Sequence, residues 1–524
     1  MRNTAFLLLL FLCSCANSGS DSDPALPARF ELLTAEATGV DFTNRVENSE
    51  DFNIFSYRNF YNGGGVAIGD LNNDGLPDLF FTANMGPNRL YLNRGELKFE
   101  DISERAGIEE ADKWSTGVAL VDINADGWLD IYVCNAGFIE GVDQRNSLFI
   151  NNQDLTFTEA AAEYQLDDNG YTTHAGFFDY DLDGDLDVYL LNNSFIPVNT
   201  LNYSNKRELR ARDWPVKDFL KGGGDKLLRN EGGKFVDVSE STGIYGSLIG
   251  FGLGVTLGDV NGDDYPDIYV SNDFFERDYL YLNQRDGTFA EELENWTSHI
   301  SHSSMGADMA DINNDDFPAV FVTDMLPDDE YRLKTTATFD NISLYQLKQK
   351  QGFYHQYMQN TLQLNDHNLG FREIAYFSGV SASDWSWGAL IFDADNDSHS
   401  DIYVCNGIYH DVINQDFIDF FANEIMQKMV LTGKKEQVDS IINQMPSVPL
   451  RNKAFRNRGD LRFRDVAAEW GFDQETFSNG AAYGDLDRDG DLDLVINNVN
   501  QPSMVFETRT EKIESAHNLS VQLR

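Results

Sequence analysis

The sequence predicts an all-β fold, a seven-bladed β-propeller, from three observations. A nine-residue acidic pattern, Asp-x-Asn/Asp-x-Asp-Gly-x-x-Asp, occurs seven times along the 524 residues. Most copies follow a run of small residues, and all are followed by a short apolar run of the kind that forms strands. Two further strand-like runs repeat with the same period. Each unit therefore supplies four strands, which is the number in a propeller blade.

The first two strands of each unit flank the acidic segment. Runs such as 65–69 (GVAIG), 117–121 (GVALV) and 388–392 (GALIF) precede it, and runs such as LFFT, IYVC and VYLL follow it. The acidic segment is therefore a strand–loop–strand connection. This distinguishes it from the loop of an EF-hand, which is flanked by helices.

The third strand is typified by 88–93 (NRLYLN) and the fourth by 98–103 (KFEDIS). The seventh unit has no good fourth-strand copy after its acidic loop, whereas an extra copy stands near the start of the chain at 29–36 (RFELLTAE), in register with 462–469 (RFRDVAAE). We expect this N-terminal strand to become the outer strand of the last blade and to close the ring, because closure removes free sheet edges.

Some blades carry insertions, because successive acidic loops are 52, 57, 80, 52, 82 and 92 residues apart. The excess lies at about 192–224, 324–359 and 407–451, in each case between the second and third strands. Up-and-down strands place these connections on the face opposite the acidic loops. Apolar residues at helical spacing within 411–444 predict a helix or two there. The insertions either cover the rim or bind a partner, and the sequence leaves both interpretations open.

The acidic loops have the donor set of a calcium site. Oxygen-bearing side chains at positions 1, 3, 5 and 9, with the backbone carbonyl of position 7, give six or seven ligands in a flexible cage, which suits Ca²⁺ better than Mg²⁺. Position 6 is usually Gly, because the chain reverses there with a positive φ. A turn alone would need only two such residues, not four donors at fixed offsets.

The predicted side-chain ligands, loop by loop, are Asp70, Asn72, Asp74 and Asp78; Asp122, Asn124, Asp126 and Asp130; Asp179, Asp181, Asp183 and Asp187; Asp259, Asn261, Asp263 and Asp267; Asp311, Asn313 and Asp315; Asp393, Asp395, Asp397 and Asp401; and Asp485, Asp487, Asp489 and Asp493. Ala319 stands at position 9 of the fifth loop. We therefore expect up to seven Ca²⁺ sites, with the fifth weak or empty. Because the carboxylates of one loop repel one another, bound calcium would stabilise the fold.

These loops, with the strands around them, resemble FG-GAP/VCBS repeats, the calcium-loop propeller repeats of integrin α-subunits. Segments 61–70 (YNGGGVAIGD) and 99–107 (FEDISERAG) more narrowly resemble bacterial proteins of the ASPIC/UnbV type, related to cartilage acidic protein. The resemblance covers about residues 29–510. In that family a small C-terminal domain follows the propeller. Segment 517–523 resembles its first strand, so we expect 511–524 to begin a truncated ASPIC/UnbV-like domain.

The start of the chain resembles an export signal. Arg2 precedes an apolar run at 5–12, too short to span a bilayer, and Leu12-Cys13-Ser14-Cys15 resembles the bacterial lipobox. This resemblance implies a signal peptide at 1–15, lipidation of Cys15, an acidic tether at 16–28, and location at the outer membrane or surface of a Gram-negative cell, held by the lipid alone. An ordinary cleaved signal peptide is the alternative. Cys134 and Cys405 are expected to be buried free thiols.

Charge excludes some classes of function. With 39 Lys+Arg against 86 Asp+Glu, the net charge of −47 opposes binding to nucleic acid and adsorption to anionic lipid. The 8 His residues form no metal-ligand spacing, and no nucleophile–base constellation stands out, although the sequence leaves enzymatic activity undecided. We interpret His174, His299 and His302 as packing or polar-rim residues.

We therefore expect a calcium-stabilised, non-catalytic binding or adhesion propeller that recognises an extracellular protein or glycan through the face opposite the calcium loops. One alternative is a carbohydrate-active enzyme of the polysaccharide-lyase type, in which basic residues of the first insertion neutralise a uronate: Arg207, Arg210, Arg212, Lys217 and Lys221. Another is an accessory lipoprotein of an outer-membrane nutrient-uptake complex.

Overall fold

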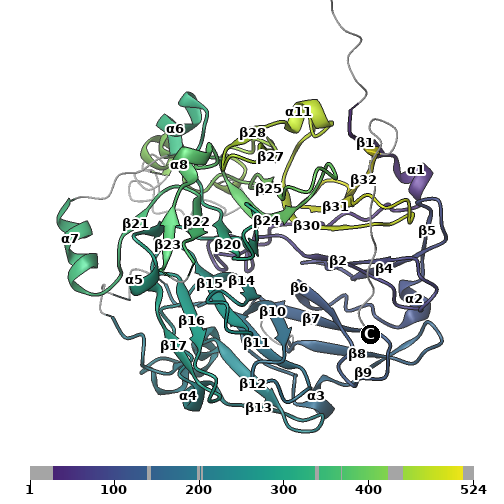
Figure 1. The fold of residues 1–524 in the computed structure, drawn as a ribbon, viewed down its shortest axis with the longest axis horizontal. Helices are drawn as coiled ribbons and strands as arrows, with labels where there is room; N and C mark the ends of the chain where they lie inside the picture. Colours follow the sequence, from purple (N-terminus) through teal and green to yellow (C-terminus); the bar gives the residue numbers. More distant parts are fainter. Residues whose placement is uncertain are drawn as a thin grey trace, which may run out of the picture.

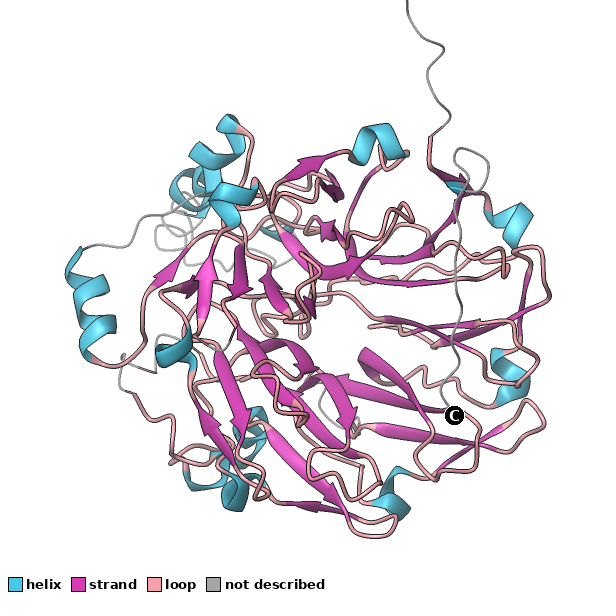
Figure 2. Ribbon diagram, in the orientation of Figure 1, coloured by secondary structure: helices cyan, strands magenta, loops and turns pink. Residues whose placement is uncertain are grey.

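The computed structural model describes residues 28–137, 143–197, 201, 205–336, 342–367, 369–422 and 441–510. Seven four-stranded antiparallel sheets stand around a central axis (Figure 1), which confirms the predicted seven-bladed β-propeller. Strands form the body of the ring, and helices lie at its periphery (Figure 2). The predicted signal peptide, the lipidation of Cys15, nearly all of the tether and the C-terminal domain fall outside the described residues.

Within each blade the strands run outward from the axis in the order first to fourth. From blade 1 to blade 7 they are β2 (Val66–Gly69), β3 (Asp78–Phe81), β4 (Arg89–Asn93) and β5 (Phe99–Asp101); β6 (Trp114–Val121), β7 (Asp130–Ala136), β8 (Ser147–Asn151) and β9 (Phe157–Glu159); β10 (Thr172–Phe178), β11 (Asp187–Asn192), β12 (Lys226–Asn230) and β13 (Phe235–Asp237); β14 (Gly252–Gly258), β15 (Asp267–Asn272), β16 (Tyr279–Asn283) and β17 (Phe289–Glu291); β19 (Ala307–Ala310), β20 (Ala319–Val322), β22 (Thr361–Asn365) and β23 (Phe371–Glu373); β24 (Ser386–Phe392), β25 (Asp401–Asn406), β27 (Lys453–Asn457) and β28 (Phe463–Asp465); and β30 (Ser478–Gly484), β31 (Asp493–Asn498), β32 (Met504–Thr508) and β1 (Phe30–Leu33).

The N-terminal strand closes the ring, as predicted. β1 pairs antiparallel with β32, with Phe30 opposite Thr508 and Leu33 opposite Val505, so the two ends of the propeller lie side by side in Figure 1. Phe30 is buried, and its ring centroid lies 4.6 Å from that of Phe472 at the end of blade 6. Blade 7 is thereby completed by hydrogen bonds and packed against its neighbour by apolar contacts.

The fourth strands are shorter than predicted, because each is followed by a one-turn helix. In blade 1 the Asp101 carboxylate accepts hydrogen bonds from the backbone N–H of Ser103, at 2.9 Å, and from its hydroxyl, so the chain leaves the sheet after Asp101. The corresponding helices are α1 (Ala35–Thr38), α2 (Ser103–Ala106), α3 (Ala161–Tyr164), α4 (Ser239–Thr242), α5 (Leu293–Trp296), α8 (Ala375–Ser378) and α11 (Ala467–Trp470).

The three insertions carry most of the remaining structure. They contain η2 (Ala211–Asp213), η3 (Asp218–Gly223), α6 (Glu330–Thr336), α7 (Ile342–Lys350), β21 (Gln356–Tyr357), the π-helix η4 (Phe417–Ala422) and β26 (Leu450–Arg451). β21 pairs with β18 (Ile300–Ser301), and β26 pairs with β29 (Glu475–Thr476). The helix predicted in the third insertion is present as η4, and 423–440 lie outside the described residues.

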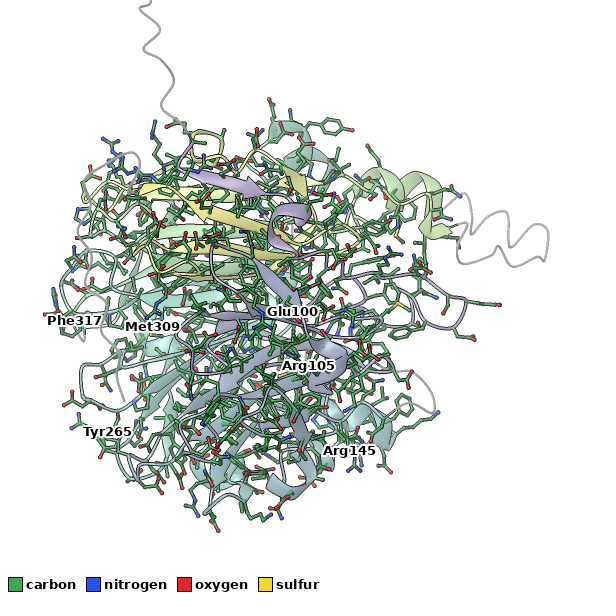
Figure 3. The ribbon with its side chains drawn as sticks, turned by 90° about the vertical axis from the view of Figure 1, so that its right-hand side faces the viewer. Glu100, Arg105, Arg145, Tyr265, Met309 and Phe317 are labelled. Atoms are coloured by element: carbon green, nitrogen blue, oxygen red, sulfur yellow. The ribbon has the colours of Figure 1, made fainter. Side chains whose placement is uncertain are left out.

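The two faces of the propeller are distinct. Seen from the side, Tyr265 and Phe317 of the acidic loops lie at one edge, whereas Arg145, in the connection between β7 and β8, lies toward the other (Figure 3). The strand order places the insertions on that second side, which we call the insertion face. The core fills the space between blades, and Cys134 and Cys405 lie in it as buried free thiols, as expected.

Candidate metal centres in the acidic loops

Each acidic loop is held in shape by its own carboxylates. The carboxylate at position 5 accepts a hydrogen bond from the backbone N–H of position 7 in all seven loops, at 2.8–3.2 Å. The carboxylate at position 1 accepts one from the N–H of position 6 in the first six, at 2.7–3.0 Å. These bonds point oxygen atoms of one loop toward a common centre.

Two residues of every loop adopt a left-handed backbone. Position 6 does so as predicted, with φ from 68° at Asp316 to 97° at Gly184. Position 4 does so too, which the sequence analysis did not predict: Asn or Gly stands there in four loops, but three loops have residues that do not favour this conformation. The occupants are Asn73, Ala125, Leu182, Gly262, Asn314, Asn396 and Arg488. The loop backbone therefore follows one shape in all seven blades, whatever residue stands at position 4.

In six of the loops position 9 is a buried carboxylate at the start of the second strand, and it joins the loop to the third strand. One of its oxygens accepts a hydrogen bond from the N–H of position 2, at 2.9–3.3 Å, and the other from the last residue of the third strand, at 2.7–2.9 Å. Burial raises the pKa of each, to about 6 for Asp130, about 7 for Asp267 and about 9 for Asp493. Each oxygen retains a lone pair for a cation, so the bonds do not exclude a ligand role.

The asparagine that ends most third strands links neighbouring blades. The side chain of Asn93 donates to the carbonyl of Leu486, at position 2 of the preceding loop, and Asn151 does the same to Leu71, both at 2.8 Å. Sequence reasoning identified this Asn as part of the repeat but assigned it no role. The role depends on a contact with a residue of the neighbouring blade that is far away in the chain, so the repeat pattern alone does not reveal it.

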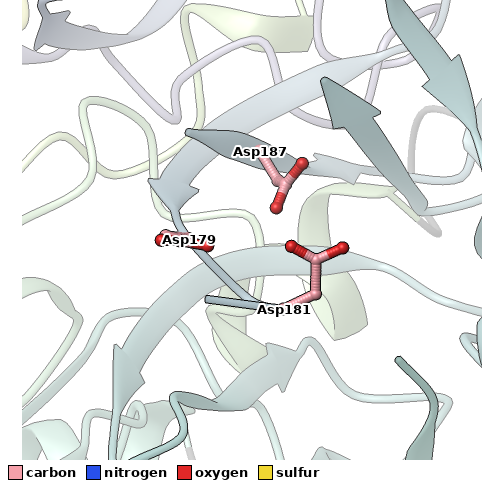
Figure 4. Close-up of side chains that lie close together, drawn as sticks. All are labelled: Asp179, Asp181 and Asp187. Carbon is pink, nitrogen blue, oxygen red and sulfur yellow. The ribbon is translucent and has the colours of Figure 1, made fainter. Parts of the chain in front are cut away.

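Three loops bring three carboxylates together. Ligand oxygens lie within 4.8 Å of one another in Asp179, Asp181 and Asp187, in Asp393, Asp395 and Asp401, and in Asp485, Asp487 and Asp489. In blade 3 the carboxylates approach from the end of β10, the loop and the start of β11 (Figure 4). All three groups contain the Asp at position 3 of their loop, where the other four loops have Asn, and they leave out one predicted ligand each: Asp183, Asp397 and Asp493.

Several loop oxygens are buried without a hydrogen-bond donor in the described residues. They include Asp181 Oδ1 in blade 3, Asn261 Oδ1 in blade 4 and Asp485 Oδ1 in blade 7, all at predicted ligand positions. A buried oxygen without a donor costs about 1–3 kcal/mol, and more when it is charged. A hard cation would satisfy these oxygens, so the donor set fits Ca²⁺.

The loop of blade 6 differs in that two guanidinium groups reach its carboxylates, whereas in blade 4 a single one, that of Arg285, lies 2.8 Å from Asp263 Oδ2. Arg456 Nε lies 2.7 Å from Asp395 Oδ2, its Nη2 lies 3.1 Å from Asp397, and Arg29 lies 3.9 Å from Asp395. Burial raises the pKa of Asp395 to about 6, although both arginines oppose the shift. These arginines stand far from the loop in sequence, and sequence analysis missed them.

The remaining predicted candidates have other partners. Arg207 donates from Nε and Nη2 to the same oxygen of Glu276, Oε1, at 3.0 and 2.6 Å, Arg212 pairs with Glu240, and Arg210 donates to a backbone carbonyl. Of these, Arg207 is buried and Arg212 is exposed, and each already has an acidic partner within the chain. His174 lines the axial channel, and His299 lies 3.4 Å from Glu373, in keeping with the polar roles predicted for them.

Fold and loops together define the class of protein: this is a seven-bladed β-propeller with acidic loops between the first and second strands of its blades. The model of the FG-GAP-like repeat matches residues 52–133 and 259–322. The chain is similar to cartilage acidic protein 1 from Xenopus tropicalis, with 40% identity over 78 residues, and from Homo sapiens, with 40% over 76 residues. These matches cover 15% and 14% of this chain but only 12% of each relative.

Among solved structures, the crystal structure of BBS1N in complex with ARL6DN, soaked with lead, matches 92% of this chain and 98% of that chain, with a TM-score of 0.42 and 10% identity. The described residues contain no helix with the length and apolar character needed to cross a membrane.

Proposed function

We propose that this protein is a calcium-stabilised, non-catalytic binding or adhesion propeller, exported to the cell surface, that recognises an extracellular protein or glycan through its insertion face. The observation that carries the calcium assignment is the set of buried loop oxygens without donors, beside position-9 carboxylates whose pKa is raised by burial. Both features indicate a missing positive charge.

The predicted ligands of blades 1–4 and 7 would hold the ion with their side chains and the position-7 carbonyl. Bound Ca²⁺ would supply the charge that lets the carboxylates of one loop lie together. In blade 6 the two arginines supply part of that charge, so its affinity for calcium should be lower. Blade 5 lacks the position-9 ligand at Ala319 and should bind most weakly.

The insertion face carries the exposed apolar side chains that a partner would cover. On α6 Tyr331 is 71% exposed, and on α7 Ile342 is 66% exposed. We take these two side chains as the candidate contact residues of the proposed partner. Both side chains lie on helices of the second insertion, and the seven blades form a closed ring without these helices.

A paired assay tests the proposed recognition. Full-length protein in Ca²⁺ is applied to a glycan array and to a panel of extracellular proteins, with Tyr331→Ser and Ile342→Ser as the variants. Tyr376→Ser serves as the control, because Tyr376 is 67% exposed on the outer rim of blade 5. The proposal expects loss of binding in the two insertion variants alone. Unsaturated uronate released from a polysaccharide would overturn the non-catalytic assignment.

A further inference from the structure

A second feature of the insertion face is a pocket at the mouth of the axial channel. Its volume is about 430 Å³, within the range of small-molecule sites. It shares Asn59, Leu253, Met305 and Trp387 with the wall of the axial channel, so it opens where the first strands converge. Most of its lining is apolar, including Met325, which belongs to the second insertion.

Methionine and tryptophan side chains suit this pocket to an apolar guest. Met305, Met325 and Met358 line it together with Trp385 and Trp387. Unbranched thioether side chains adapt to guests of different shape and make favourable contacts with aromatic rings. The apolar part of the pocket therefore favours an aliphatic or aromatic group.

Charged groups of opposite sign line the same pocket. Arg58 is held by its stacking over the rings of Phe251, at 4.2 Å, and Phe274, at 5.2 Å, and by a 2.7 Å hydrogen bond from Nη2 to the carbonyl of Ser194. Asp273 lines the pocket too, and its Oδ1 is buried with no hydrogen-bond partner in the described part of the chain. Burial raises the pKa of Asp273 to about 7, although the charge of Arg58 opposes this.

The two charges do not form an ion pair with each other in the described structure. Arg58 donates to Ser194 and Asp273 accepts a side-chain hydrogen bond from Ser303, but Asp273 Oδ1 remains for a partner brought by a ligand. Trp385 adds a third polar group: it is only 6% exposed, and its indole N–H has no partner among the described residues. A buried charge is costly unless it is paired, so a ligand that supplies both signs satisfies the site best.

We propose that this pocket binds a free apolar α-amino acid, with the ligand carboxylate on Arg58, its ammonium group on Asp273 and its side chain among the methionine and tryptophan residues. A monoanion would leave Asp273 unpaired, and on a chain of net charge −47 it would be repelled overall. A monocation would leave Arg58 unpaired. Because a ligand with only one charge leaves either Asp273 or Arg58 unpaired, the ligand should be a zwitterion. This site is separate from the surface proposed above to recognise a protein or glycan.

Isothermal titration calorimetry on the full chain in Ca²⁺ tests this. The probes are L-tryptophan, L-phenylalanine, L-leucine and L-methionine, with glycine as the probe that lacks a side chain. Indole-3-propionate lacks the ammonium group, and tryptamine lacks the carboxylate. We expect at least one apolar amino acid to bind, and each analogue that lacks one charge to bind at least about tenfold more weakly, as loss of a charged hydrogen bond implies.

Substitution then separates direct contact from loss of fold. Asp273→Asn should abolish the preference for L-tryptophan over indole-3-propionate, and Arg58→Gln the preference over tryptamine. Arg94→Gln, which removes an exposed arginine paired with Glu100, should change neither preference. An unchanged thermal midpoint shows that a variant is folded.

Three results would overturn the proposal: no binding of any apolar amino acid at millimolar concentration, a single-charge analogue that binds as tightly as the zwitterion, or unchanged preferences in both pocket variants. Failure here leaves the Tyr331 and Ile342 assay unaffected, so the two proposals fail separately.

Discussion

The buried carboxylate at position 9 gives the sharpest prediction about stability. In blade 4, Asp267 accepts hydrogen bonds from the backbone N–H of Val260, at 2.9 Å, and of Asn283, at 2.8 Å, and it is fully buried. Replacement by Ala leaves both N–H groups without an acceptor and opens a small cavity. Replacement by Asn keeps one acceptor oxygen and nearly the same volume.

The magnitude follows from counting unsatisfied groups. A buried donor left without its acceptor costs about 1–3 kcal/mol, so Asp267→Ala should destabilise the fold by about 2–6 kcal/mol and Asp267→Asn by about half as much. Asp264→Asn is the control within the same loop. Asp264 is exposed at position 6 with φ 69°, which Asn tolerates, so we expect a change within about 0.5 kcal/mol.

Urea unfolding in EDTA at pH 5 measures these differences, because burial keeps Asp267 protonated there and the substitutions remove no buried charge. Repetition in Ca²⁺ measures what the ion adds. In EDTA the order of stability should be wild type and Asp264→Asn, then Asp267→Asn, then Asp267→Ala. Equal urea midpoints for Asp267→Ala and the wild type would show that the two hydrogen bonds to Asp267 do not stabilise the fold, which would contradict this prediction. Equal urea midpoints for Asp264→Asn and Asp267→Ala would show that any change in stability comes from the lost carboxylate charge in the loop and not from the two hydrogen bonds.

Three further predictions concern the same framework. In EDTA, the free energy of unfolding should fall as pH rises from about 4 to about 9. Burial raises the pKa of the position-9 carboxylates, so the folded state binds protons that the unfolded state releases. Thermal midpoints measured across this pH range check the prediction, and a midpoint that rises with pH would contradict it. Ala319→Asp should add a ligand to the fifth loop, and calorimetry should detect one more bound calcium per chain; unchanged stoichiometry would count against the ligand geometry. Phe30→Ala should cost about 3–5 kcal/mol through loss of the buried contact with Phe472, measured by urea unfolding; a cost near zero would show that β1 does not close the ring.

Repetition is the reason that the sequence predicts so much of the fold. Seven copies of one strand–loop–strand pattern specify the blades, and the extra fourth-strand copy at Phe30 specifies the closure that β1 and β32 make. The positive φ of position 6 was predictable because Gly occupies most copies. The left-handed conformation of position 4 was not, because Leu182 and Arg488 adopt it under the constraint of the surrounding hydrogen bonds.

Contacts between distant residues escaped prediction. Asp395 has the same place in its loop as Asp181, yet only Asp395 meets Arg29, which directly precedes β1, and Arg456, which lies on β27 of the same blade. The same holds for the pocket at the axial mouth, where Arg58 and Asp273 come from unrelated segments. A repeat pattern describes what the blades share, whereas these features arise where blades differ.

Calcium binding by the loops is the central claim, and native mass spectrometry of the full chain, alongside thermal unfolding with and without EDTA, tests it most directly. We predict about five or six calcium ions per chain, from the loops of blades 1–4 and 7 and the weaker loop of blade 6. The thermal midpoint should rise with calcium concentration, because a single site contributes about 2.7 kcal/mol of stability at one hundred times its dissociation constant. A chain that binds no calcium and whose midpoint is the same in EDTA and in millimolar Ca²⁺ would contradict it.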